Sequence, residues 1–251
     1  PNFMKKSFFF AAAAAALALS QTAGAQTNIQ TFYDFGRGYA TTTLEMFKGD
    51  SWGNTFFFVD HYYATADQRA DQGCASAING SYFEIERNIN FWQDSALGAL
   101  SAMVEYDGST WGAGIFCVGA SYFLHSDDFK NTYTLALLYD QHIGYGSASL
   151  PVKFSGVWGM QDLFGVKGLR FSGFIDVWGN DQTCVINADP LNYKTEDTKF
   201  SVLTEPQLWY NVGQHFGCDN LHVGGEVELS FNFAGHYGFM CNPCLGVKWD
   251  F

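Results

Sequence analysis

The chain of 251 residues carries a formal net charge of −12 at pH 7, with 13 Lys and Arg residues against 25 Asp and Glu. The basic residues form no cluster, which excludes a typical nucleic-acid-binding surface. Aromatic residues make up 18% of the chain, and mean hydropathy is close to zero. Such a balance is expected if every strand turns one face to lipid and the other to water.

The N-terminal segment has the pattern of a secretory signal peptide. Two lysines follow the expected start of translation at Met4, and an apolar run covers residues 8–19. Small residues at 23–25 provide a cleavage site. A transmembrane helix needs about 20 apolar residues, more than this run supplies. We expect residues 4–25 to be removed and residues 26–251 to form a single exported domain.

The rest of the chain predicts an all-β fold. Apolar and polar residues alternate in about twelve segments, which is the period of a β-strand. In chain order, the expected strands are roughly 29–36, 40–48, 53–63, 80–92, 96–107, 112–124, 130–140, 150–160, 168–178, 198–211, 220–233 and 241–251. Most connections are short, whereas residues 64–79 and 179–197 are expected to be long loops.

The segment LHVGGEVELSFNF, residues 221–233, raises the question of which strand face lies inside. Its apolar face would point inward in a soluble barrel and outward in a membrane barrel. The signal peptide, the strand length and the terminal Phe251 favour the membrane barrel. The sequence thus predicts a transmembrane antiparallel up-and-down β-barrel. Aromatic residues expected near strand ends fit the two interfacial girdles: Trp52, Tyr63, Trp92, Tyr106, Trp111, Trp158 and Trp249.

The C-terminus is expected to serve assembly. A last strand that ends on an aromatic residue is common in bacterial outer-membrane barrels, and here that residue is Phe251. The expected partners are therefore outer-membrane lipid and, through Phe251, the barrel assembly machinery. We expect a monomer in the bacterial outer membrane, with no metal, no cofactor and no nucleic acid bound.

Several strands resemble a known family. The stretches TFFFVDHYY, SYFEIERNINFW, LRFSGFIDVWGND, TKFSVLTEPQLWYNVG and GGEVELSFNFAG are similar to the Tsx-like nucleoside-specific outer-membrane channels, and most of all to a branch whose domain has unknown function. The resemblance covers essentially the whole mature chain and implies a twelve-stranded channel for small solutes, including nucleosides. Asp60, Glu84 and Glu86 are the positions that best match the nucleoside channels.

Strand alternation assigns a set of side chains to the lumen. They are Phe56, Phe58, Asp60, Tyr62, Glu84, Glu86, Glu105, Arg170, Phe174, Asp176, Trp178, Glu205, Gln207, Trp209, Glu226 and Glu228. The same alternation adds Glu45, Lys153, Lys199 and Lys248, so acids outnumber bases on this face. Aromatic rings can stack on a nucleobase and carboxylates can accept hydrogen bonds from ribose. These side chains could equally well fill and crosslink a narrow barrel.

Two other sequence features and one other architecture leave alternatives open. His125 and Ser126 suggest a membrane-embedded lipid hydrolase, although adjacent strand residues point in opposite directions. Arg87 falls on the apolar face of its strand, so it should lie near an interface or at a bulge. A closed structural barrel is the remaining alternative. We expect a non-enzymatic diffusion channel.

The cysteines allow more than one pairing. Cys218 could join Cys241 or Cys244, and Cys74 could join Cys184, but spacing alone does not fix disulfide connectivity. Unpaired thiols are the alternative. Cys241 and Cys244 have the spacing of a metal or redox motif, although zinc requires four ligands.

Overall fold

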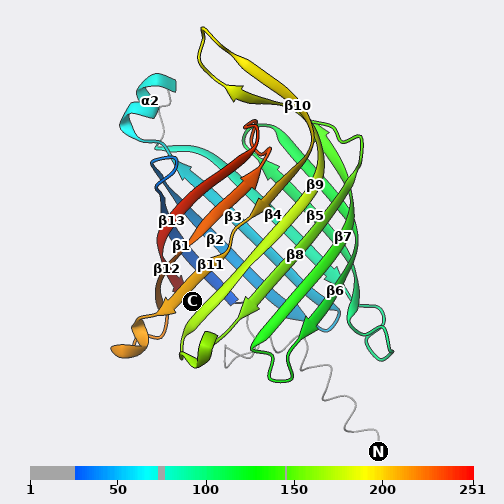
Figure 1. Ribbon diagram of the computed structural model, residues 1–251. Coiled ribbons are helices and arrows are strands. Elements are labelled where there is room, and N and C mark those ends of the chain that lie inside the picture. Colours follow the sequence, from blue (N-terminus) through cyan, green and yellow to red (C-terminus); the bar gives the residue numbers. More distant parts are fainter. Residues whose placement is uncertain (1–25, 73–76, 145) are drawn as a thin grey trace, which may run out of the picture.

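The computed structural model describes residues 26–72, 77–144 and 146–251. They form one antiparallel sheet that closes into a barrel with twelve strand positions (Figure 1). The strands are β1 (Gln26–Asp34), β2 (Tyr39–Asp50), β3 (Gly53–Tyr63), β4 (Ile78–Ile89), β5 (Leu100–Ser109), β6 (Ala113–His125), β7 (Asn131–Gly144), β8 (Val152–Met160), β9 (Leu169–Asn187), β10 (Lys194–Thr204), β11 (Gln207–Asn211), β12 (Leu221–Phe231) and β13 (Phe239–Asp250). The helical segments are α2 (Ala66–Gln72), η1 (Leu163–Gly165) and η2 (Gly213–His215).

The first and last strands close the barrel. β1 pairs with β13 in an uninterrupted register from Asn28 opposite Asp250 to Asp34 opposite Cys244. Closure removes the free edges that an open sheet would leave, so the backbone N–H and C=O groups along the wall are paired. The predicted all-β barrel is therefore confirmed.

One strand position is broken, which the sequence did not predict. β10 and β11 both lie between β9 and β12, but Glu205 and Pro206 separate them. Pro206 has no backbone N–H to donate to the ladder. The break still satisfies its remaining groups, because the Pro206 carbonyl oxygen accepts a hydrogen bond of 3.1 Å from the Val227 N–H. The predicted single strand 198–211 is thus two segments.

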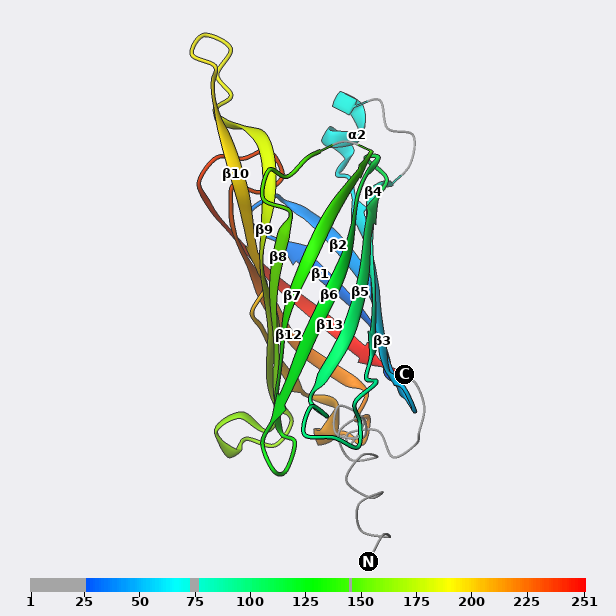
Figure 2. The same ribbon diagram turned by 90° about the vertical axis from the view of Figure 1, so that its right-hand side faces the viewer.

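The expected long loop at 179–197 is wrong. β9 continues to Asn187 and β10 begins at Lys194, with Thr183 opposite Asp197, so only residues 188–193 connect them. This hairpin projects beyond the barrel rim that also carries α2 (Figures 1 and 2). Its residues are largely polar on both faces, so they lack the alternation by which the other strands are recognised. The connection at residues 64–77 is long, as predicted, and includes α2.

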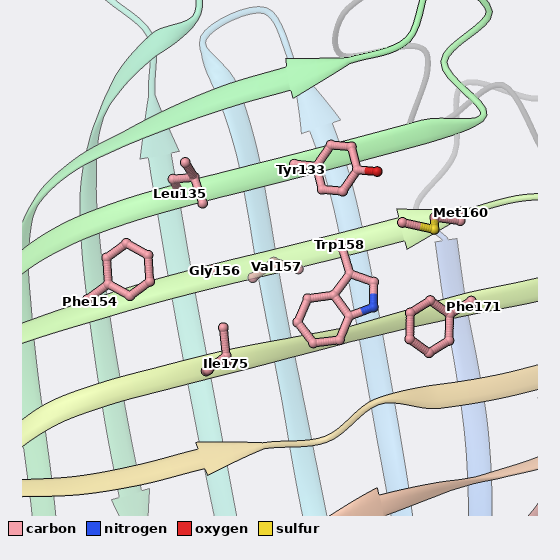
Figure 3. Close-up of a pocket in the computed structure, with 9 residues that line it drawn as sticks. All are labelled: Tyr133, Leu135, Phe154, Gly156, Val157, Trp158, Met160, Phe171 and Ile175. Carbon is pink, nitrogen blue, oxygen red and sulfur yellow. The ribbon is translucent and has the colours of Figure 1, made fainter.

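The outer wall is apolar. In the first half of β8, Val152 and Phe154 are exposed while Lys153 and Ser155 are buried, so the two apolar side chains point outward. A shallow groove of about 270 Å³ lies on this outer face (Figure 3). Its lining consists of Tyr133, Leu135, Phe154, Gly156, Val157, Trp158, Met160, Phe171 and Ile175. No helix within residues 26–72, 77–144 and 146–251 is long and apolar enough to cross a membrane.

Two ion pairs lie at the barrel rim opposite α2. Arg87 binds both carboxylate oxygens of Asp50, at 2.6 and 3.0 Å, and also the Thr55 hydroxyl at 3.1 Å. Asp50 ends β2 next to a tight turn, so Arg87 lies near the barrel rim, one of the two placements expected for it. On the same rim, the Lys130 ammonium donates to the Asp162 carboxylate at 2.8 Å and thereby joins two turns.

The turn pair Lys130–Asp162 should make stability depend on pH. The hydrogen bond from Lys130, followed by that from the Gly168 N–H, lowers the pKa of the Asp162 carboxyl below its usual value near 4. A lowered folded-state pKa gives stability that is present above the unfolded-state pKa and lost as pH falls through the folded-state pKa. We expect Asp162→Asn to melt at a slightly lower temperature than the parent at pH 7, and the difference to disappear as pH falls through the lowered pKa of Asp162. Thermal unfolding in detergent would measure it, and a difference that persists at low pH would contradict it.

Candidate functional site: the polar interior of the barrel

The barrel turns its polar face inward. In β1, Gln30 and Asp34 are only 2% and 3% exposed, whereas Ile29 and Tyr33, each directly before one of them, are exposed. β12 repeats this pattern, because Glu228 is buried while Val223 on the opposite face is exposed. The apolar face of residues 221–231 therefore points outward, as expected for a membrane barrel.

A buried lysine, Lys153, pairs with two acids inside the barrel. The Lys153 ammonium on β8 lies 2.5 Å from a Glu105 carboxylate oxygen on β5 and 3.0 Å from an Asp176 carboxylate oxygen on β9. β6 and β7 separate β5 from β8 in the sheet, so the Lys153–Glu105 bond crosses the barrel interior. All three side chains are nearly fully buried. Lys153 thus ties three strands together from inside.

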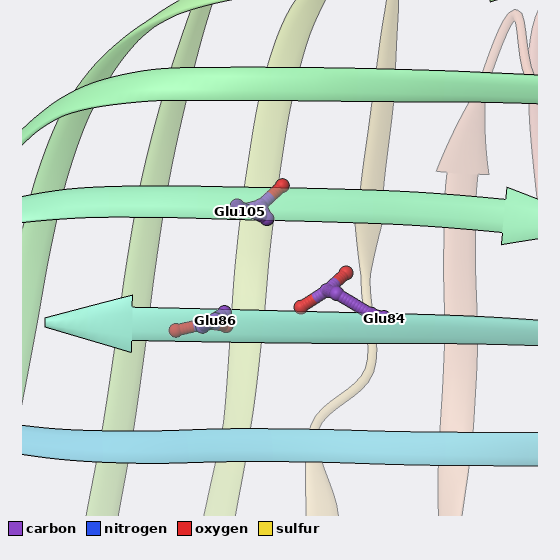
Figure 4. A group of neighbouring side chains, drawn as sticks. All are labelled: Glu84, Glu86 and Glu105. Atoms are coloured by element: carbon purple, nitrogen blue, oxygen red, sulfur yellow. The ribbon is translucent and has the colours of Figure 1, made fainter.

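Three predicted carboxylates lie together on one wall. Glu84 and Glu86 of β4 and Glu105 of β5 each present an oxygen within 4.8 Å of the others (Figure 4). Glu86 is opposite Glu105 in the β4–β5 register, and Glu84 is opposite Asp107. The wall therefore concentrates negative charge on two adjacent strands.

An aromatic strip adjoins this acidic wall on β3 and β4. The Phe58 ring lies 6.0 Å from Phe56 and 5.7 Å from Tyr82, measured between ring centroids. The Tyr82 hydroxyl is 3.4 Å from a Glu84 carboxylate oxygen, so the strip and the acidic wall touch. Further along β3, Tyr62 and Asp60 share a contact of 3.3 Å between the phenol and the carboxylate.

A second polar group lies on β11 and β12. The Gln207 amide donates to Glu226 at 2.8 Å and accepts from the Trp209 indole N–H at 2.9 Å. Trp209 is completely buried, with its ring 5.5 Å from Phe32 and the Lys248 ammonium 5.0 Å from its centroid. Because β1 and β11 are not neighbours, this packing also crosses the interior.

Glu228 is held by a neighbouring network. The Asn242 amide donates to the Glu228 carboxylate at 3.0 Å, and Arg37 from the β1–β2 turn forms an ion pair with the same group. Arg37 also lies 3.3 Å from Asp34. This arginine, in a turn, escaped the sequence prediction because strand alternation does not reach turns.

The remaining predicted residues are dispersed. Trp178 packs edge-on against Phe233 at 5.9 Å, and Arg170 is opposite Trp209 in the β9–β11 register. Phe174 is half-buried, two residues before Asp176. Glu205 sits in the break between β10 and β11. These side chains belong to the interior without joining the acidic wall.

One predicted lumenal base is misplaced. A register shift between Thr198 and Phe200 interrupts the alternation of β10, so Thr198 and Ser201 are both buried. Lys199 is instead 69% exposed and lies 3.4 Å from Asp181 in the projecting hairpin. A β-bulge inserts one extra residue and reverses the facing of what precedes it, which alternation alone cannot detect.

Sequence analysis missed several buried acids. Asp107 ends the expected strand 96–107 and was not assigned to the lumen, yet it lies within β5 and is 6% exposed on the inner face. Asp140 of β7 is 1% exposed, and neither of its carboxylate oxygens has a hydrogen-bond partner among the residues that the structure describes. Extending the alternation past Glu105 by two residues would have found Asp107.

His125 and Ser126 do not form the hydrogen-bonded pair that the lipid hydrolase alternative requires. The Ser126 hydroxyl lies 2.7 Å from Asp128 and accepts a 3.1 Å bond from the Asn131 N–H, so it shapes the β6–β7 turn. The His125 ring nitrogen contacts the Ser126 backbone oxygen rather than its hydroxyl. His125 instead stacks on Phe129 with 3.8 Å between centroids.

Of the alternatives left open for the cysteines, unpaired thiols are what the structure shows for the described residues. Cys218 precedes β12 at one rim, while Cys241 and Cys244 pair with the far half of that strand. Cys184 is a free, buried thiol in β9, and Cys74 lies outside the described residues. Cys241 is exposed and Cys244 is buried, so the two side chains point to opposite faces and share no metal or redox site.

Comparison with known proteins gives the family. Residues 25–251 match the family model described as "Domain of unknown function (DUF5020)". The chain belongs to this family. A search of curated protein sequences found no match.

Three solved structures of other proteins are similar over most of the chain. A NanC porin structure has a TM-score of 0.51 at 11% identity, covering 89% of this chain and 98% of the porin. The COG4313 outer membrane channel from Pseudomonas putida F1 reaches 0.47 at 9% identity, with 92% and 97% covered. Salmonella typhi outer membrane phospholipase (OMPLA) reaches 0.38 at 10% identity, with 90% of each chain covered. At such low identity, the NanC match supports the barrel fold alone.

The Lys153 bridge predicts a large, rescuable loss of stability. Lys153→Met leaves Glu105 and Asp176 buried without their cation, which typically costs about 3–5 kcal/mol. Adding Glu105→Gln and Asp176→Asn to Lys153→Met removes the orphaned charges and should recover most of that loss. Urea unfolding of the barrel in lipid vesicles would measure both. A loss of less than about 1 kcal/mol for the single variant would contradict the bridge.

Proposed function

We propose that this protein is a narrow channel of the bacterial outer membrane that admits small neutral and cationic solutes. The observation that carries this proposal is the acid-rich interior of a closed barrel whose outer wall is apolar. An apolar outer band and a polar interior are the arrangement of barrels in the outer membrane. The structural likeness to a NanC porin is compatible with this proposal.

The charges of the interior favour cations. Among Glu84, Glu86, Glu226 and Glu228, only Glu228 forms an ion pair within the described residues, and its partner is Arg37. The Lys153 ammonium is paired with Glu105 and Asp176. A confined, low-dielectric passage strengthens the field of such an excess. Rings of carboxylates are a common source of cation selectivity in channels.

Nucleosides are the proposed substrate class. Phe58 and Tyr82 provide aromatic faces beside the Glu84 carboxylate. Stacking of a base on an aromatic ring contributes about 1–3 kcal/mol. A carboxylate next to such a ring can accept hydrogen bonds from ribose hydroxyls. The sequence resemblance to the Tsx-like channels motivates this choice.

A closed structural barrel is the second candidate, and one observation favours it. Many inner-face side chains are almost inaccessible, including Gln30, Lys153, Trp209 and Asp140. Small barrels are commonly filled by their own side chains. Any passage through this interior must therefore be narrow or must open by side-chain movement.

Planar bilayer recordings separate the two candidates. We expect discrete single-channel currents from the purified protein, and a reduction of current when a nucleoside such as adenosine is added. The absence of current at high protein density would favour the closed barrel. Currents that nucleosides leave unchanged would retain the channel and remove the substrate class.

The cation preference should depend on the β12 carboxylates. Replacing both Glu226 and Glu228 with Gln keeps their size and hydrogen bonding but removes two charges. We expect reversal potentials in a KCl gradient to move toward the nonselective value. The change should be larger at low salt, because the screening length is about 30 Å at 0.01 M and about 10 Å at 0.1 M.

A matched control removes two charges elsewhere. Glu196 and Asp197 are exposed on the projecting β9–β10 hairpin, so Glu196→Gln with Asp197→Asn should leave the reversal potential close to that of the parent. An unchanged preference in the β12 variant, or an equal change in the hairpin control, would show that Glu226 and Glu228 do not face the conducting path.

A further inference from the structure

We propose that Glu84, Glu86, Glu105 and Asp107 form a binding site for one divalent metal cation on the inner wall of the barrel, with Ca²⁺ as the preferred ion. The site does not require that the barrel conduct solutes. It is a property of one wall and can be tested without transport.

Three of the four carboxylates lie close together. The three glutamates each offer one carboxylate oxygen, and these oxygens lie within 4.8 Å of one another. They come from adjacent positions of two paired strands, β4 and β5, so the sheet register holds their backbones in place. Figure 4 shows the three side chains gathered between these strands.

Asp107 is an independent indication that a ligand belongs there. It is 94% buried, since only 6% of it is exposed, and it lies opposite Glu84 in the register. Its Oδ1 atom has no hydrogen-bond partner among the residues that the structure describes. A buried carboxylate oxygen without a donor is costly, and a metal ion coordinated by that oxygen would relieve the cost.

The protein's own cations neutralise only part of this wall. Lys153 forms ion pairs with Glu105 and Asp176. Within the described part of the chain, no ion pair reaches Glu84, Glu86 or Asp107. Glu105 has a second carboxylate oxygen, so it can contact Lys153 and a metal together. One divalent cation would offset most of the remaining negative charge.

The ligand chemistry selects the ion. Carboxylate oxygens are hard ligands that suit Ca²⁺ and Mg²⁺. Ca²⁺ takes about six to eight oxygen ligands in a flexible geometry, whereas Mg²⁺ demands near-ideal octahedral geometry and usually keeps several waters beside one or two carboxylates. A wall that offers several carboxylates at neighbouring positions therefore suits calcium better than magnesium.

Calorimetric titration of the chelator-treated, detergent-solubilised protein with CaCl₂ tests the site. We expect saturable binding of one equivalent and weaker binding of MgCl₂. Glu84→Gln and Glu86→Gln should each weaken calcium binding at least tenfold. Glu226→Gln removes an inner-face carboxylate on β12, away from this wall, and should change the affinity less than twofold. Heat-dependent gel mobility verifies that each variant remains a folded barrel.

Terbium luminescence gives a second readout that needs no change in the ligands. Tyr82 lies beside Glu84, so Tb³⁺ bound at this wall should emit when tyrosine is excited, and Ca²⁺ should quench the emission by displacement. Tyr82→Phe should reduce the emission while preserving the calcium affinity measured by calorimetry.

Three results would overturn the proposal. They are the absence of saturable calcium binding by the folded parent, an equal loss of binding in Glu226→Gln, and binding of 1,4-diaminobutane in place of calcium. The last result would assign the wall to organic cations. If the glutamine variants fail to fold, Tyr82→Phe remains decisive, because unchanged terbium emission would place the ion elsewhere.

Discussion

Closure of the sheet by β1 and β13 is the constraint on which the rest of the structure depends. Once all strands are paired in a ring, one face of each strand must look into a small shared volume. The register of that ring also matters, because a slip of one residue would exchange the two faces of a strand. The uninterrupted β12–β13 register keeps Glu226 and Glu228 inside and their apolar neighbours outside.

Charge is the second constraint on the structure, because the closed interior brings many charged side chains together. Carboxylates enter from many strands, whereas Lys153 is the cation that bridges β5, β8 and β9. Its position lets a single ammonium group satisfy two buried acids across the barrel. Glu84, Glu86 and Asp107 lie beside this bridge without an ion pair in the described part of the chain. This imbalance underlies both the proposed cation preference and the proposed metal site.

The same interior is also densely filled. Trp209 of β11 packs against Phe32 of β1 and Lys248 of β13, and Met103, Cys117, Ala136 and Leu138 form an apolar cluster on β5, β6 and β7. This packing fills part of the interior. A solute in the proposed channel would pass close to flat rings and carboxylates.

The sequence by itself determined the barrel, most strand positions and the facing of most side chains, because the two-residue strand period is a local property. It placed Glu105, Asp176, Trp209 and Glu228 on one face without knowing their partners. It failed where the period is weak or interrupted: at the polar β9–β10 hairpin, at the bulge beside Lys199 and at Pro206.

Only the tertiary structure decided which inner residues meet. Lys153 and Glu105 are 48 residues apart in sequence, and Phe32 and Trp209 come from strands that are not adjacent. Such contacts depend on the register of every intervening strand pair and on the curvature that closes the ring. No single strand encodes the register of the other strand pairs or the curvature of the ring. The fold could therefore be predicted from the sequence, whereas the arrangement of the charged interior could not.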